Sequence, residues 1–319
     1  MTAARVVSLV VADDEVGERL DRLLGARLST EGVSRSAASR LCDEGRVRVR
    51  GAVAKASAKV RAGDAIEVEI PPPEPSAAEP EDIPLAIVFE DEHLLIIDKP
   101  AGMVVHPAKG HARGTLVNAV LHHAEVEGDD DDDPMRPGIV HRIDRLTSGL
   151  LVVAKTPAAR EGLVARFKAH DIERAYLAIA EGAAPERVTY DTFHDRHPSD
   201  RLRFTSRVRE GRRAVTHVAR EALLAGGAAS LVRCTLETGR THQIRVHLAE
   251  HGHPLLGDPV YGRRAKDPRV DAIARALGRQ ALHAAVLGFA HPITGAPLRF
   301  EAPPPEDFAR ALAALRALR

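Results

Sequence analysis

Two short polar segments contain the groups best suited to chemistry, HRIDRLTSG at residues 141–149 and TGRTHQIRVH at residues 238–247. In the first segment, Asp144 has an arginine at position 142 and another at 145, and nearby cations favour an ionised carboxylate. An ionised carboxylate in a fixed position can act as a nucleophile or anchor an ion pair. In the second segment, the guanidinium of Arg245 could hold a carboxylate through two hydrogen bonds. The residue types alone leave a catalytic site and a structural Arg–Asp network as alternatives.

A metal site is a third alternative, because HLAEH at residues 247–251 matches the H-x-x-E-H pattern of one zinc protease class. Residues four apart share one face of a helix and could both bind zinc. The sequence lacks a suitably placed third ligand downstream, and Gly252 is expected to end the helix. We therefore expect no metal here. We expect His247 and His251 to lie at the surface near a helix C-terminus, where positive charge is favourable.

Regular elements must position both polar segments. Continuous apolar runs predict buried strands at residues 94–97, 150–154, 175–180 and 231–236. The first polar segment thus precedes one strand and the second follows another, and binding residues are common on loops held by such a scaffold. Thr238 or Thr241 is expected to cap the helix that carries Arg245.

The first 70 residues predict a small separate domain of two helices followed by strands. Apolar residues between Val16 and Leu28 follow helical spacing, and a second helix is expected to begin after Ser34 and end near Gly45. Residues 46–50 read RVRVR, so a strand here would face two valines inward and three arginines outward.

Basic residues dominate this small domain. Between residues 33 and 61 there are eight basic residues and two acidic ones. Clustered positive charge binds phosphate backbones through counterion release, and a solvated surface with scattered arginine is the alternative. The arginines that we expect to bind RNA are Arg35, Arg40, Arg46, Arg48 and Arg50.

A proline-rich stretch divides the chain. Residues 71–80 read PPPEPSAAEP, and prolines at this density favour extended polyproline II. We expect a first domain at residues 1–70, a linker at 71–84 and a second domain at 85–319. Five consecutive aspartates at 129–133 predict a solvated loop; a calcium site is the alternative, but the run lacks the ligand spacing of an EF-hand.

Composition limits the class of protein. The 319 residues include 45 Lys+Arg and 45 Asp+Glu, which excludes a uniformly basic coat but not local basic patches. Two cysteines suit a reducing compartment, and no apolar run approaches the roughly 18 residues of a membrane span. We expect a soluble cytoplasmic monomer with no membrane association.

Several segments resemble known families. RLDRLLGARL, VSRSAASRLCDEGRVRVRG and VRAGDAIEVEIP, within residues 17–71, resemble the S4 RNA-binding domain. HRIDRLTSGLLVVAKT, together with FEDEHLLIIDKPAGMVVHP, ERAYLAIAEG, ETGRTHQIRVHLAEHGHPLLGDPVYG and ALHAAVLGFAHPITG, resembles the RluA-type pseudouridine synthases over about residues 85–300. With the S4-like domain in front, the chain is most similar to the D subtype of that family, which acts on large-subunit ribosomal RNA.

The resemblance implies an α+β protein with a small S4-like (αL) domain and a catalytic domain whose mostly antiparallel mixed β-sheet is flanked by helices. It implies isomerisation of uridine to pseudouridine in RNA without a cofactor. Asp144 matches the catalytic aspartate, Tyr176 the tyrosine that packs against the target base, and Arg245 the basic residue paired with the aspartate. Arg142 would help to bind or replace the flipped nucleotide. The rival function is RNA binding by an inactive synthase domain.

The reaction itself leaves one choice open. The N-glycosidic bond must break, the uracil must turn, and C5 must bond to C1′. A carboxylate could capture the sugar at C1′ or add to C6 of the base, and the sequence does not choose between these routes. In either route a stacked uracil is out of reach, so the base must be flipped out of its stack.

Overall fold

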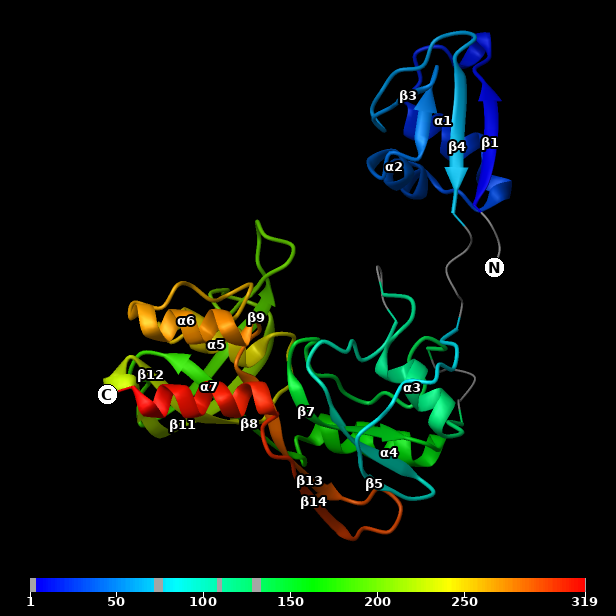
Figure 1. The fold of residues 1–319 in the computed structure, drawn as a ribbon. Helices are drawn as coiled ribbons and strands as arrows, with labels where there is room; N and C mark the ends of the chain where they lie inside the picture. Colours follow the sequence, from blue (N-terminus) through cyan, green and yellow to red (C-terminus); the bar gives the residue numbers. More distant parts are fainter. Residues whose placement is uncertain (1–3, 72–76, 108–110, 128–132, 319) are drawn as a thin grey trace. The chain divides into compact units, whose positions relative to one another are not determined.

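The computed structural model describes residues 4–71, 77–107, 111–127 and 133–318. The chain forms two compact units, Met1–Pro75 and Ser76–Arg319 (Figure 1). Of the predicted linker, residues 72–76 lie outside the described residues, and residues from Ser76 onward group with the second unit. For example, the Glu81 amide donates to the carbonyl of Asn118 at 2.9 Å. The predicted aspartate loop lies outside the described residues except for Asp133.

The first unit is an antiparallel sheet packed against two helices. Its strands, in spatial order, are β1 (Arg5–Val10), β4 (Ala65–Ile70), β2 (Val47–Val49) and β3 (Ala52–Val53), and its helices are α1 (Leu20–Arg27) and α2 (Arg35–Asp43). Leu20, Leu24 and Ile66 are fully buried between sheet and helices. The predicted cap is confirmed, because Ser34 Oγ accepts a hydrogen bond from the Ala37 amide at 3.2 Å.

Two predictions for this unit need correction. Helix α1 begins at Leu20 rather than near Val16, because Gly17 (φ +82°) makes a turn that leaves Val16 exposed. Strand β1 precedes the helices and was not expected; its valines at positions 6 and 10 are exposed, so the run carries little pattern of burial. In β2 the prediction holds for Val47, which is buried, and for Arg48, which is exposed.

The second unit is built on one large sheet. Among its described residues ten strands take part, in the order β10 (Phe204–Thr205), β9 (Arg187–Arg196), β11 (Arg212–Leu224), β12 (Ala229–Leu236), β8 (Glu173–Glu181), β13 (Leu282–Ala290), β7 (Ser148–Ala154), β6 (Leu94–Lys99) and β5 (Ile87–Glu90), with β14 (Pro297–Glu301) paired to β13. Every pair is antiparallel except β13 with β7. The predicted α+β class with a mostly antiparallel mixed sheet is therefore confirmed, and so are the four predicted strands.

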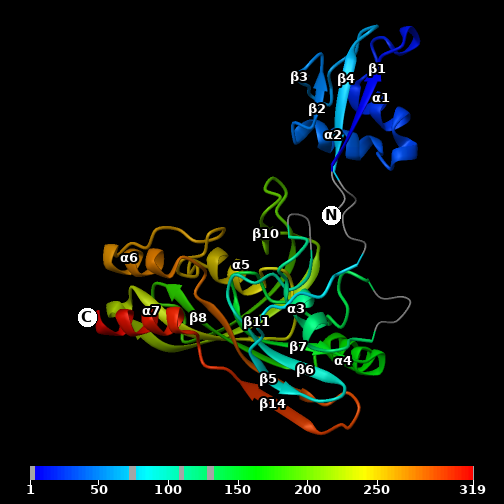
Figure 2. The same cartoon turned by 45° about the vertical axis from the view of Figure 1, so that its right-hand side comes forward.

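Helices cover both faces of this sheet, as Figures 1 and 2 show. They are α3 (Leu116–His123), α4 (Pro157–Ala169), α5 (Gln243–Glu250), α6 (Pro268–Leu277) and α7 (Glu306–Ala317). One core contains Leu116 of α3 and Ile244 of α5, whereas the opposite face of the sheet packs against Leu163 of α4 and Phe308 of α7. Within the described part of the chain, no helix is long and apolar enough to cross a membrane.

The parallel junction between β7 and β13 depends on Gly149, which pairs with Ala284. Its backbone lies in the left-handed region at φ +112°, and a Cβ atom there would meet the Ala284 carbonyl oxygen at 2.2 Å. Only glycine fits this approach. The loop that carries Asp144 therefore leads directly into a strand whose position is fixed.

Candidate active site

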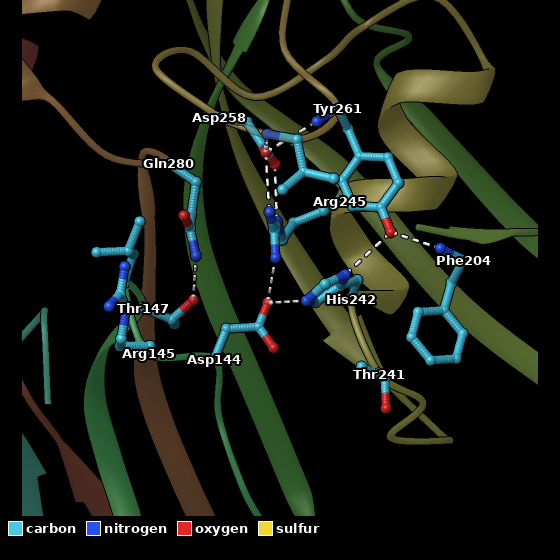
Figure 3. A network of polar contacts seen from close by, with 12 residues as sticks. Asp144, Arg145, Thr147, Phe204, Thr241, His242, Arg245, Asp258, Tyr261 and Gln280 are labelled. Carbon is cyan, nitrogen blue, oxygen red and sulfur yellow. Dashed lines mark hydrogen bonds and ion pairs between the residues drawn. The ribbon is translucent and has the colours of Figure 1, made fainter. Parts of the chain in front are cut away.

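Asp144 and Arg245 meet in one site, although 101 residues separate them in the chain (Figure 3). Arg245 Nη1 donates to Oδ2 of Asp144 at 2.9 Å. No described residue donates a hydrogen bond to the other carboxylate oxygen, Oδ1. The structure thus joins the two polar segments and leaves one oxygen of Asp144 without a protein donor.

A second carboxylate, Asp258, holds the same guanidinium from the other side. Arg245 Nε donates to Asp258 Oδ2 at 2.7 Å, and Nη2 donates to Oδ1 at 2.9 Å. Burial alone would lower the pKa of Arg245, but its hydrogen bonds and charge interactions with Asp258 and Asp144 outweigh burial and raise it. Burial would likewise raise the pKa of Asp258, yet Arg245 lowers it. Arg245 is therefore a permanent cation facing Asp144.

The turn before α5 aims Arg245. His242, not Thr238 or Thr241, is the N-cap residue, and it has a left-handed backbone at φ +59°. The capping prediction is wrong because the Thr238 hydroxyl is used elsewhere: it accepts from the Val215 amide at 2.8 Å and donates to Oε1 of Gln243 at 2.8 Å. The Gln243 amide group also donates to the Val215 carbonyl at 2.9 Å. Gln243 thus fastens the start of α5 to strand β11.

Two buried cations hold the loop that carries Asp144. The Lys99 ammonium donates to the carbonyls of Pro100, Met103 and Arg145 at 2.8, 3.0 and 3.2 Å. Burial lowers the pKa of Lys99 to about 7, and the charge of Asp144 opposes that shift. Carbonyl acceptors on both sides of the ammonium tie the Asp144 loop to the residues that follow β6.

Arg279 is the second cation beneath this loop. Its Nη1 donates to the Leu146 carbonyl at 3.2 Å, and its Nε and Nη2 donate to Asp307 at 2.6 and 2.8 Å. Asp307 lies in the first turn of α7. The last helix of the chain therefore supports the loop that positions Asp144.

A pocket of about 490 Å³ opens above Asp144. Asp144, Arg142, Tyr176 and Arg245 all line it, so the structure brings together the four residues predicted for the second domain. Arg142 is exposed, whereas Tyr176 is 8% exposed. Burial raises the pKa of Tyr176, which keeps its hydroxyl protonated. The pocket thus offers an aromatic surface, a carboxylate and cations.

The arginines predicted for the first unit differ in their partners. Arg35 lies 3.3 Å from Asp21, Arg46 2.6 Å from Glu69, and Arg50 2.5 Å from Asp64. Arg40 and Arg48 are exposed and have no acidic partner within the described residues. The last two are consequently the most available to a phosphate.

The predicted location of His247 is wrong. It is fully buried, and its ring lies 2.9 Å from the hydroxyls of Thr192 and Thr216. Burial lowers its pKa to about 4, so the ring is neutral. His251, by contrast, is exposed and stacks on Tyr190. Among the residues that the structure describes, no three His, Cys, Asp or Glu side chains form a group able to hold a metal.

Sequence reasoning missed three groups near Asp144: His242, Asp258 and Tyr261. All three occur in the segments TGRTHQIRVH and GDPVYG, which were singled out without a role for these residues. His242 Nε2 lies 3.9 Å from Oδ2 of Asp144, and its Nδ1 lies 2.9 Å from the Tyr261 hydroxyl. The signal available was a charged residue, Asp258, inside an otherwise apolar turn.

Comparison with known proteins gives consistent matches for both units. Residues 93–250 match the model of the RNA pseudouridylate synthase family, and residues 18–66 match that of the S4 domain. Ribosomal large subunit pseudouridine synthase D of Zymomonas mobilis is 47% identical over 303 residues, 94% of each chain. The protein of the same name from Xanthomonas campestris is 44% identical and covers 96% of this chain and 92% of its own.

Solved structures agree with these matches. The human protein RNA Pseudouridylate Synthase Domain Containing 1 superposes with a TM-score of 0.53 at 26% sequence identity. The match covers 73% of this chain and 86% of the human one.

Proposed function

The chain belongs to the family of RNA pseudouridine synthases, which isomerise uridine to pseudouridine in RNA, and on this premise we propose that it acts on large-subunit ribosomal RNA with Asp144 as the nucleophile. The names of its relatives support the substrate, because both of those compared above are large-subunit ribosomal enzymes. Mapping pseudouridines in ribosomal RNA from cells with and without the gene tests this part: modified positions that persist without the gene are not its targets.

The single observation that carries the assignment of Asp144 is its Oδ1 atom, which receives no hydrogen bond from the described protein while Oδ2 is held by Arg245. A carboxylate so held stays charged and keeps one oxygen for attack. Attack at C1′ forms a bond from Oδ1 to the sugar as the bond to N1 breaks, and the uracil carries away the electron pair. Attack at C6 instead forms a bond from Oδ1 to the base and sends the electrons of the C5–C6 double bond toward O4, after which the N1–C1′ bond breaks. In both routes C5 bonds to C1′ and the bond to the carboxylate breaks, which returns Asp144 unchanged. C5 loses its hydrogen as a proton, and N1 takes up a proton.

Tyr176 supports base flipping. A flipped uracil loses its stacking partners, and an aromatic ring in the pocket can replace them at about 1–3 kcal/mol per base. The raised pKa of its hydroxyl favours this stacking role over that of a base which removes the C5 proton. Arg142 is exposed and lines the pocket, which supports a role in filling the gap left in the RNA or in binding its phosphates.

The first unit would bind RNA through its basic side chains, for which the candidates are Arg35, Arg40, Arg46, Arg48 and Arg50. Such contacts position RNA without reading its sequence. We also propose that the protein acts as a monomer in the cytoplasm. The isomerisation transfers no atoms or electrons to another molecule, so we expect no cofactor.

Release of tritium from RNA labelled at C5 of uridine tests the assignment, because C5 loses its hydrogen when it bonds to C1′. Asp144→Asn keeps the shape of the side chain but removes the charge, and we expect turnover to fall by at least roughly 10³-fold with RNA affinity unchanged. Normal turnover by this variant would exclude Asp144 as the nucleophile. No release by the wild-type protein on any RNA would favour the rival function, RNA binding by an inactive synthase domain.

A further inference from the structure

One imidazole nitrogen in the active-site pocket, Nε2 of His242, has no hydrogen-bond partner among the residues that the structure describes. His242 lines the pocket, and its Nε2 atom lies 3.9 Å from Oδ2 of Asp144. That distance is too long for a hydrogen bond. The hydrogen bond made by this ring within the described residues is at its other nitrogen, Nδ1. Nε2 therefore faces the reactive carboxylate without a hydrogen-bonding partner of its own.

The hydroxyl of Tyr261 contacts Nδ1 of His242, and this contact favours a proton on the other ring nitrogen, Nε2 (Figure 3). This oxygen accepts a hydrogen bond from the Phe204 amide at 2.8 Å, and it lies 2.9 Å from Nδ1 of His242. Within the described residues, Nδ1 is the acceptor in reach of the Tyr261 O–H, and a proton on Nε2 lets this hydroxyl donate while the imidazole N–H, not its lone pair, points toward the Asp144 carboxylate. Burial lowers the pKa of His242, although the charge of Asp144 opposes this, so the ring is neutral. We therefore assign its single proton to Nε2, the nitrogen that faces Asp144.

The backbone of His242 also has an unusual conformation. His242 occupies the N-cap of α5 at φ +59° and ψ +17°, a left-handed conformation that is unfavourable for most residues with a side chain. Its side chain makes no capping hydrogen bond to the helix. The start of α5 therefore lacks a capping hydrogen bond from this side chain, and the ring of His242 instead lines the pocket beside Asp144. Residues other than glycine are uncommon in this conformation, although His and Asn adopt it more readily than most, and such residues are found often at functional sites.

Either route of the reaction places negative charge on the uracil. When the bond from C1′ to N1 breaks, the electron pair left on N1 delocalises onto the neighbouring O2 carbonyl. When the carboxylate adds to C6, the electrons move toward O4. A neutral, fixed donor close to the attacking carboxylate can stabilise either oxygen without reorganising and without transferring its proton.

We propose that His242 donates a hydrogen bond from Nε2 to a carbonyl oxygen of the target uracil and stabilises the charge that develops there. This inference rests on the proposed function. It makes His242 a catalytic residue in its own right, beside Asp144, and makes Tyr261 a positioning residue that fixes the tautomer.

Three variants test the proposal. His242→Phe keeps a ring and removes the donor, so we expect kcat to fall about 10²-fold with little change in KM for RNA. His242→Asn keeps an N–H donor and tolerates the left-handed backbone, so it should retain more activity than the Phe variant. Tyr261→Phe removes only the hydroxyl that fixes the tautomer, and its loss should be smaller than that of His242→Phe. His123→Phe, on α3 and outside the pocket, is the matched control.

Sulfur substitution of the substrate separates a hydrogen bond to uracil from a merely structural role. Sulfur is a weak acceptor, so 2-thiouridine or 4-thiouridine at the mapped target should slow the wild-type enzyme when the replaced oxygen is the one bound. The same substitution should have no additional effect on His242→Phe. The proposal fails if both thio substitutions slow wild type and variant by the same factor, or if His242→Phe keeps the wild-type kcat.

Pseudouridine formation by the wild-type enzyme on unmodified RNA tests the proposed function separately from the role of His242. No pseudouridine from that reaction would overturn the proposed function itself. Normal wild-type turnover together with equal thio effects in both proteins would remove only the role of His242.

Discussion

The carboxylate of Asp258 accepts two parallel hydrogen bonds, of 2.7 and 2.9 Å, from the guanidinium of Arg245. Because a guanidinium is planar and rigid, these two hydrogen bonds fix the direction of the remaining nitrogen, Nη1, which donates to Asp144. Asp258 is itself held by the amides of Val260 and Tyr261 at 2.9 and 3.0 Å. The orientation of the nucleophile is thus set by a residue that does not line the pocket.

Replacing Asp258 should therefore damage catalysis and stability together. Asp258→Asn leaves a buried guanidinium with less compensation, and breaking a buried ion pair costs about 3–5 kcal/mol. We expect a lower free energy of unfolding and a kcat about tenfold lower, with KM for RNA unchanged, from denaturant titration and steady-state kinetics. A rise in KM at constant kcat would contradict a positioning role.

The ring and the hydroxyl of Tyr176 can be tested separately. If the ring stacks on the flipped uracil, Tyr176→Phe should keep most of the wild-type kcat/KM. Tyr176→Leu should lose about 1–3 kcal/mol of stabilisation, which is about 5- to 150-fold in kcat/KM. Tritium release by the two variants measures both values. Equal losses for Phe and Leu would instead assign the function to the hydroxyl.

Of the five arginines predicted to bind RNA, Arg40 and Arg48 have no acidic partner among the described residues and should contribute most to binding. Replacing Arg40 and Arg48 together by Gln should weaken binding and lower the salt dependence by about 0.7–0.9 in the log–log slope for each phosphate that is no longer neutralised. Arg27→Gln is the control, because Arg27 is paired with Glu15 at 2.8 Å. Filter binding over a range of salt gives both numbers, and an unchanged slope in the double variant would argue against a phosphate-binding face.

Stability should fall as the pH drops because of His247. Its pKa is lowered to about 4 by burial, whereas an unfolded histidine has a pKa of about 6.5. At a pH between these two pKa values, the histidine is protonated in the unfolded chain and neutral in the folded chain, so lowering the pH favours unfolding. The free energy of unfolding should change by up to about 1.4 kcal/mol per pH unit because of this one group. Denaturant titrations between pH 7.5 and 4.5 should show a shallower slope for His247→Gln; equal slopes would contradict a neutral, buried His247.

Much of the fold could be read from apolar runs. The strands at 94–97, 150–154, 175–180 and 231–236 were predicted because buried strands are continuously apolar, and each is present. Strand β1 could not be predicted in this way, because its exposed valines do not follow the pattern of a buried face. Burial is a property of the assembled sheet, and a short edge strand shows little of it in its own residues.

The residues of the site could be predicted from the sequence, but most of the contacts between them could not. The charges around Asp144 pointed to an ionised carboxylate, yet local sequence did not identify Arg245 as its partner. Asp258 was missed because its function depends on a bend that brings it back to α5, and no local pattern encodes that approach. His247 was misplaced for a similar reason: a histidine near a helix end resembles a surface residue until β9 and β11 supply the two threonines that enclose it.

The link from Asp307 through Arg279 to the Leu146 carbonyl has a consequence for how the protein is made. Translation delivers α7 after Asp144 and Arg245, so a nascent chain already holds these two residues while the anchor beneath the Asp144 loop is still missing. Full support of the reactive loop would thus have to wait for α7. A premature stop codon between residues 283 and 306 would delete this support of the reactive loop while sparing every group that lines the pocket.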